Sequence, residues 1–156
     1  MQAFRTIYRY WAALLFLAVI VQIGAAAYGG FYASEKLGDQ TGSDETKSIT
    51  EKVFDHGFGF HVGFGYIILL GALVLLLLAL AARLGKRRVL FALAVPVAVA
   101  VQIVLAWASE SVSGIGFLHG INALVIFGLT GSLVGQAWWG TRRPASTTPA
   151  PTTPAA

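Results

Sequence analysis

The chain has 156 residues, of which 56% are hydrophobic and only 12% are charged. A soluble domain carries roughly twice that charged fraction, so the composition excludes a polar, water-covered surface and predicts that lipid surrounds the chain. The absence of cysteine excludes disulfides, iron–sulfur clusters, thiolate metal sites and cysteine nucleophiles. The formal charge of +4 does not indicate nucleic acid, because the charges sort by membrane side.

Four stretches reach the roughly 20 apolar residues that a membrane-spanning helix needs. In chain order they are residues 9–31, 55–83, 89–109 and 115–139. A polar segment, 34–52, separates the first two, and a tight turn at 109–114 separates the last two. We predict an all-α membrane protein, a bundle of four transmembrane helices over residues 1–143. The Pro/Ala/Ser/Thr tail, 144–156, is predicted to be disordered.

The basic residues predict the orientation of the bundle. Eight of them flank one side of the predicted helices: Arg5, Arg9, Arg83, Lys86, Arg87, Arg88, Arg142 and Arg143. Only Lys36, Lys47 and Lys52 fall on the other side, together with all seven acidic residues. Because cytoplasmic loops carry the excess of Lys and Arg, we expect a multi-pass protein of the cell (plasma) membrane with both termini in the cytoplasm.

The sequence contains an internal echo. Residues 18–23 resemble residues 98–103, and each segment carries a glutamine, Gln22 or Gln102. The second and fourth stretches each carry a histidine shortly after their start. Apolar sequences often resemble one another by chance, but matched polar residues in a membrane are rare. We therefore predict two helix pairs in parallel pseudo-repeat, which also argues against reading the first stretch as a cleavable signal.

His61 and His119 are predicted to lie at one depth near the outer face, on helices diagonal to each other in the bundle. Two facing imidazoles are what the iron of a heme needs as axial ligands. The histidines could instead make ordinary buried polar contacts, or bind zinc or another metal.

Small residues flank both histidines on the same helix faces. They are Gly57 and Gly65 around His61, and Gly116 and Ala123 around His119. A flat macrocycle needs such room, although small residues also line ordinary helix contacts in membranes. Three amides lie nearby: Gln22, Gln102 and Asn122. They are expected to form hydrogen bonds between helices or, alternatively, to contact a bound ligand.

His56 and Asp55 lie at the predicted water boundary. His56 points about 140° away from His61 on a helix, which favours an interfacial side chain over an alternative ligand or proton relay. Asp55 is expected to interact with the helix dipole at a helix start, with a catalytic carboxylate as the alternative.

The chain resembles one half of heme A synthase. Residues 102–106 followed by an outer turn and Leu118-His119 resemble the third and fourth helices of such a half, and residues 21–24 its entry helix. The resemblance implies a four-helix bundle that binds heme through histidines of its second and fourth helices. The family places a glutamate three residues ahead of its helix-two histidine, where this chain has Phe58, so synthase activity is not expected.

A second resemblance is to a family of small uncharacterised four-helix membrane proteins of high-GC bacteria. It rests on His61, Gly65 and Tyr66, and on the Leu-His-x-x-Asn-Ala-Leu segment at 118–124. The residues together predict a b-type heme-binding membrane protein, acting in electron transfer or heme handling with quinone or a respiratory complex as partner. The alternatives are a cofactor-free accessory or scaffold subunit of a larger membrane complex, and a small transporter.

Overall fold

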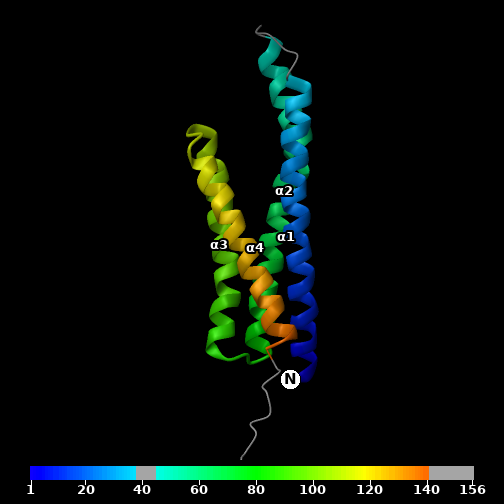
Figure 1. Cartoon of the computed structure of the whole chain (residues 1–156), viewed down its shortest axis with the longest axis vertical. Coiled ribbons are helices and arrows are strands. Elements are labelled where there is room, and N and C mark those ends of the chain that lie inside the picture. Colours follow the sequence, from blue (N-terminus) through cyan, green and yellow to red (C-terminus); the bar gives the residue numbers. More distant parts are fainter. Residues whose placement is uncertain (38–44, 141–156) are drawn as a thin grey trace, which may run out of the picture.

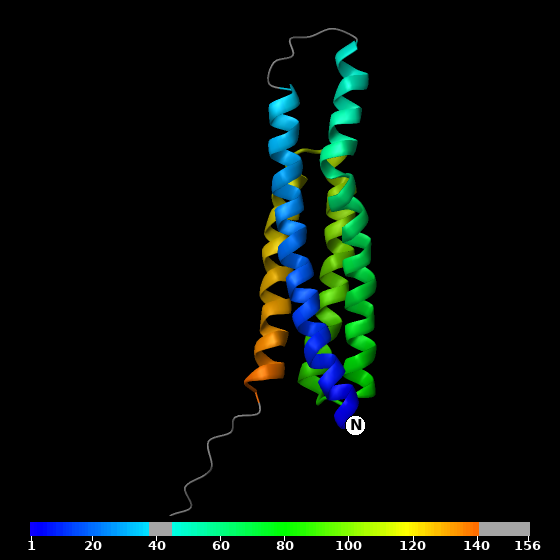
Figure 2. The same ribbon diagram turned by 90° about the vertical axis from the view of Figure 1, so that its right-hand side faces the viewer.

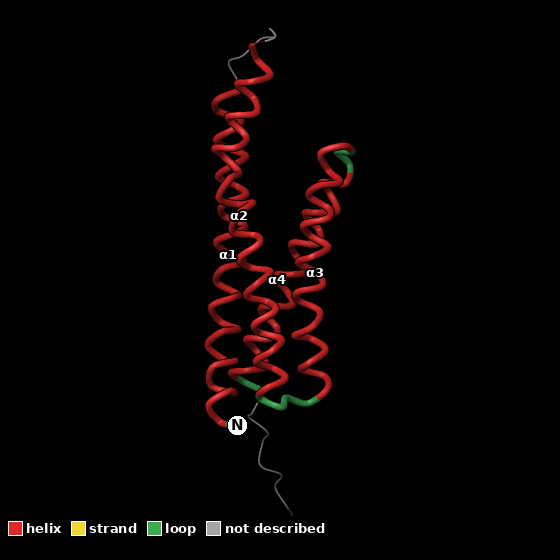
Figure 3. Tube along the Cα trace, turned by 180° about the vertical axis from the view of Figure 1, so that it is seen from behind, coloured by secondary structure: helices red, strands yellow, loops and turns green. Residues whose placement is uncertain are grey.

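The computed structural model describes residues 1–37 and 45–140, and of these the side chains of 45–49 are left out of the description. Four helices make up nearly all of the described chain (Figure 3). They are α1 (Gln2–Leu37), α2 (Glu45–Ala81), α3 (Lys86–Ser111) and α4 (Ile115–Trp138). Short connections at 82–85 and 112–114 join α2 to α3 and α3 to α4. The predicted disordered tail, 144–156, lies outside the described residues.

The first two helices are longer than the sequence predicted. α1 continues past residue 31 to Leu37, and α2 begins at Glu45 rather than at 55. The predicted polar loop at 34–52 is therefore largely helical where it is described. The segment from 31 to 37 contains neither proline nor glycine, so nothing in it stops a helix when the sequence turns polar. A loss of hydrophobicity marks where a helix leaves lipid, not where it ends.

The four helices form a bundle in which each contacts two neighbours. Close backbone contacts join α1 to α2, α2 to α3, α3 to α4 and α4 to α1. Within the described residues no such contact joins α1 to α3 or α2 to α4, so these helices lie across the two diagonals. We call the end that carries residues 2, 81, 86 and 138 the N-terminal end, and the opposite end, with residues 37, 111 and 115, the far end.

The pairs α1/α2 and α3/α4 diverge toward the far end, and α1 and α2 extend beyond the other two (Figures 1 and 2). At the N-terminal end the helices pack closely around a core of small and branched side chains. Its fully buried members include Ala72, Leu75, Ala92, Val95 and Leu133. Ridges of small residues let helices approach closely in a membrane. The packed core thus holds one end of the bundle while the other end opens.

Two contacts fix α1 against α2. The indole N–H of Trp11 donates to the carbonyl of Gly71 over 2.8 Å. Further along, Gly29 and Gly57 face each other so closely that a Cβ on Gly29 would lie 2.9 Å from the Gly57 carbonyl oxygen and 2.7 Å from the ring of Phe58. Only glycine fits there.

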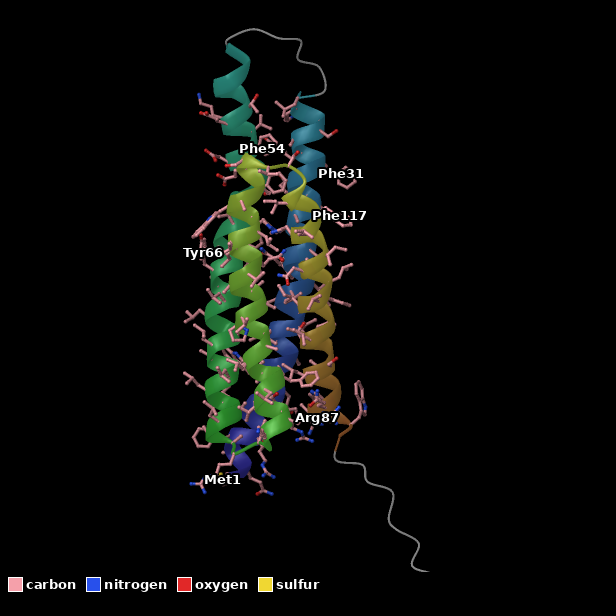
Figure 4. All side chains as sticks on the ribbon, turned by 90° about the vertical axis from the view of Figure 1, so that its left-hand side faces the viewer. Met1, Phe31, Phe54, Tyr66, Arg87 and Phe117 are labelled. Carbon is pink, nitrogen blue, oxygen red and sulfur yellow. The ribbon has the colours of Figure 1, made fainter. Side chains whose placement is uncertain are left out.

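The outer surface of the bundle is apolar. Phe31 is 78% exposed and Phe117 73%, and Figure 4 shows both side chains and Tyr66 projecting away from the helices. All four helices are long and apolar enough to cross a membrane. A backbone whose hydrogen bonds are satisfied within each helix and whose surface is apolar suits lipid. The chain is a multi-pass, all-α membrane protein.

Candidate functional site

A glutamine and a histidine tie α1 to α2 in the half of the bundle toward the far end. The side-chain amide of Gln22 donates from Nε2 to the backbone carbonyl of His61 over 2.8 Å. In return, Nδ1 of the His61 ring lies 3.1 Å from the backbone carbonyl oxygen of Gln22. Gln22 thus forms the predicted hydrogen bond between helices, and its partner is the backbone carbonyl of His61.

The same pair of bonds ties α3 to α4. Gln102 donates from Nε2 to the carbonyl of His119 over 3.0 Å, and Nδ1 of His119 lies 3.1 Å from the carbonyl oxygen of Gln102. The distances and the direction of each bond repeat those of the first pair. The internal echo of the sequence is therefore a repeat of hydrogen-bonded structure as well.

These bonds fix the proton of each imidazole. A carbonyl oxygen only accepts hydrogen bonds, so the ring nitrogen beside it, Nδ1, carries the proton. In a neutral ring the other nitrogen, Nε2, then holds a free lone pair. A backbone carbonyl behind Nδ1 is also the arrangement that orients histidines which bind metals through Nε2. Both His61 and His119 are held as acceptors at Nε2.

The two imidazoles meet across the bundle. Their ring centres lie 6.4 Å apart with the ring planes at 60° to each other, although α2 and α4 have no close backbone contact. The prediction that the two histidines approach at one depth across a diagonal is confirmed. His61 and His119 are each partly buried.

Both histidines line a partly open cavity of about 330 Å³ between the two helix pairs. Its lining follows the repeat. From α1 come Val19, Gln22, Ile23 and Ala26, and the same four residue types return 80 positions later from α3 as Val99, Gln102, Ile103 and Ala106. The volume is typical of a small-molecule site, for which about 300–1,000 Å³ is usual.

The second and fourth helices contribute in the same way. From α2 come His61, Val62, Gly65 and Ile68, and 58 positions later α4 supplies His119, Gly120, Ala123 and Ile126. Three lining residues have no lining counterpart: Tyr66, Trp107 and Glu110. Gly120, Trp107 and Glu110 were not predicted for the site. Gly120 and Val62 occupy equivalent positions in the repeat, because each directly follows its histidine. The spacing of the repeat could therefore have indicated Gly120.

The polar side-chain atoms that the two glutamines and two histidines leave free are acceptors. Nε2 of both glutamines is used on histidine carbonyls, and Nδ1 of both histidines on glutamine carbonyls. What these four residues leave free is the lone pair on Nε2 of each imidazole and the side-chain oxygen of Gln22, which is buried and has no partner. Tyr66, Trp107 and Glu110, whose side chains also carry polar groups, line the cavity as well. The two Nε2 lone pairs suit an occupant that accepts electron pairs from both imidazoles.

Asn122 distinguishes the two halves. Its amide donates to the carbonyl of Ala98 over 2.9 Å and to Oε1 of Gln102 over 2.7 Å. The corresponding position of the other half is Phe64, which offers no donor, so Oε1 of Gln22 stays unpaired. Asn122 itself is not among the residues that line the cavity, and it acts by holding Gln102.

Two small residues lie elsewhere than predicted. Gly57 was expected to leave room beside His61, but it is buried against α1, with Gly29 as its neighbour. Gly116 does not line the cavity, and a Cβ there would meet only Ser109 at 3.9 Å. Spacing along one helix gives the face of a residue but not the neighbour on that face. Gly65 and Ala123, the other two predicted residues, do line the cavity.

His56 and Asp55 lie outside the site. Both are exposed, and the His56 ring rests against the ring of Tyr32 with 5.1 Å between their centres. Neither residue lines the cavity.

A bare metal ion finds few protein ligands here. Within residues 1–37 and 50–140, no cluster of three or more His, Asp or Glu side chains is placed to hold one. A structural zinc site takes four protein ligands and a catalytic one takes three.

No family model, curated protein or solved structure matches the chain.

Proposed function

We propose that this protein is a membrane-bound b-type heme protein, with His61 and His119 as the two axial ligands of one iron. A heme supplies four ligands of its own and leaves two opposite positions for the protein. When bound, it supplies reversible one-electron oxidation and reduction.

The observation that carries the proposal is the spacing of the two imidazoles. A metal–nitrogen bond of about 2 Å, with about 1.2 Å more from each nitrogen to its ring centre, puts two collinear rings on one metal about 6.4 Å apart. The ring centres of His61 and His119 are 6.4 Å apart. Rings on a common axis can rotate about it, so an angle of 60° between their planes is compatible with shared coordination.

The surroundings of the rings also suit a flat apolar ligand. The cavity lies between the two diverging helix pairs, and a macrocycle perpendicular to the line between the histidines would lie between these pairs. Beside the histidines the lining is small, with Gly65 and Gly120 among its members. The chain's own part is to hold both Nε2 atoms toward the iron and to keep water away.

The role of such a protein would be electron transfer or heme handling. The site lies in the half of the bundle toward the far end, which the distribution of basic residues places outside the cytoplasm. Both termini would then be cytoplasmic and the membrane would be the cell membrane. With a single heme near the outer face, redox exchange would take place on that side, with quinone or a respiratory complex as partner.

Absorption and paramagnetic resonance spectra of the protein purified in detergent test this proposal. We expect one heme per chain, a sharp Soret band and a low-spin signal typical of two axial histidines. His61→Ala and His119→Ala should each abolish that low-spin signal. His56→Ala, which removes an exposed histidine of the same helix, should leave it unchanged.

Colourless, fully helical protein that takes up no added hemin would overturn the proposal and favour the cofactor-free scaffold subunit. So would heme-loaded protein whose spectrum does not change in either ligand variant. Circular dichroism of each variant separates loss of heme from loss of fold.

A further inference from the structure

Each half of the site contributes one histidine, but the two halves differ in the number of side-chain hydrogen bonds that link the helices around that histidine. In the α3/α4 half the amide of Gln102 is bonded at both of its atoms, by Nε2 to the His119 carbonyl and by Oε1 to Asn122. Asn122 is itself bonded to the carbonyl of Ala98. Three side-chain hydrogen bonds thus link α3 to α4 around His119, besides the one from its ring.

The α1/α2 half has only one such bond. Gln22 donates to the carbonyl of His61, and its Oε1 is buried without a partner. Phe64 stands where the other half has its asparagine, and Ala18 offers a carbonyl at the position of Ala98. Each missing bond removes a restraint on the helix that carries the histidine.

We propose, building on the proposed heme site, that His119 is the permanent ligand and His61 the exchangeable one. If His61 left the iron, its position would become a binding site for a small neutral ligand that coordinates through one atom, such as a diatomic gas.

The ligand variants test the inequality directly. In membrane nanodiscs loaded with heme, His61→Ala should retain heme on His119, whereas His119→Ala should lose most of it. The measurement is the heme-to-protein ratio after passage over a desalting column. Equal loss in the two variants would overturn the proposal, even if both had lost the low-spin signal.

Carbon monoxide tests the exchange. Reduced wild-type protein should bind it, with a rate that levels off at high concentration because departure of His61 becomes limiting. Phe64→Asn builds the missing donor opposite Gln22 and Ala18. Since a net hydrogen bond is worth about a factor of five in an equilibrium, this variant should lower the limiting rate by about five-fold or more. Phe64→Leu, which adds no donor, should stay within about two-fold of wild type on the same reasoning.

Hydrogen exchange of the heme-free protein supplies a further test. In heme-free protein, Phe64→Asn should slow hydrogen exchange of the amides at 61–65 relative to Phe64→Leu, because a second helix-to-helix bond then holds this segment. Wild-type holoprotein that binds no carbon monoxide, or equal limiting rates in the two Phe64 variants, would overturn the exchange. Protein that takes up no heme at all would instead overturn the proposed function.

Discussion

Gln102 and His119 are joined by two hydrogen bonds that run in opposite directions between α3 and α4. The glutamine side chain donates to the histidine backbone, and the histidine ring donates to the glutamine backbone. One residue thus sets both the position of the helix at His119 and the proton on its ring. The consequence is that a glutamine which never touches the iron would control how well the histidine binds it.

Gln102→Leu should therefore weaken heme binding more than Gln22→Leu. Removing Gln102 takes the second donor from the His119 carbonyl, which keeps its helical bond, and leaves an amide N–H of Asn122 without its partner; an unpaired buried group costs about 1–3 kcal/mol. Removing Gln22 takes only the second donor from the His61 carbonyl, because Oε1 has no partner. Hemin titration of the heme-free proteins measures the difference, and equal losses would contradict the assignment.

The contact between Gly29 and Gly57 predicts a sharp steric effect. Gly29→Ala places a methyl group 2.7 Å from the ring of Phe58 and 2.9 Å from a backbone oxygen, so α1 and α2 must move apart. Overpacking of this kind costs about 1–3 kcal/mol. Thermal unfolding in detergent should show it.

The adjacent residue supplies the control for that variant. A Cβ on Gly30 would meet nothing within 4 Å, so Gly30→Ala should leave the unfolding temperature unchanged or raise it slightly, because alanine favours helix. A similar fall in both variants would show that backbone flexibility, and not the contact with α2, is what glycine provides here.

At the N-terminal end, Arg9 and Trp138 connect α1 to α4. The guanidinium carbon lies 3.6 Å from the centre of the indole ring, within the range of a cation–π contact. A double-mutant cycle of Arg9→Gln and Trp138→Leu should give a coupling of about 0.5–2 kcal/mol. Arg5→Gln paired with Trp138→Leu is the control, since Arg5 is exposed, and its coupling should be near zero.

The natural absence of cysteine makes the orientation directly measurable. Val112 lies in the exposed turn between α3 and α4, and Gly85 in the exposed turn between α2 and α3. The two test variants are Val112→Cys and Gly85→Cys. In intact cells a membrane-impermeant thiol reagent should label the first and not the second, because in the proposed topology, which rests on the eight basic residues, the Gly85 side faces the cytoplasm. The reverse pattern would invert the proposed topology.

The sequence was informative where polar residues are rare. In chains so apolar, His61 and His119 stand out, and their similar distance from the predicted outer ends of the apolar stretches, at 55 and 115, was sufficient to predict that they meet. Gln22 and Gln102 were recognised by the same rule. What could not be read was their partner, because a backbone carbonyl is present at every residue and leaves no mark in the sequence.

The errors have physical causes as well. Gly57 shares a helix face with His61, yet α1 approaches that face at Gly57, and only the packing of two helices decides this. The ends of α1 and α2 were placed at the loss of hydrophobicity, although a helix continues in water until its sequence interrupts it. The difference between Asn122 and Phe64 was visible in the sequence, but its meaning depends on the unpaired oxygen of Gln22.

The unequal helix lengths have a consequence for access to the site from the water. α1 continues fifteen residues beyond Gln22, whereas α3 continues only nine beyond Gln102. α2 begins sixteen residues before His61, and α4 only four before His119. At 1.5 Å per residue the first pair stands roughly 9–18 Å taller above the histidines. Figure 2 shows α1 and α2 extending beyond α3 and α4. A soluble electron carrier could therefore come close to the proposed heme only over α3 and α4, so productive encounters would be confined to one side of the molecule.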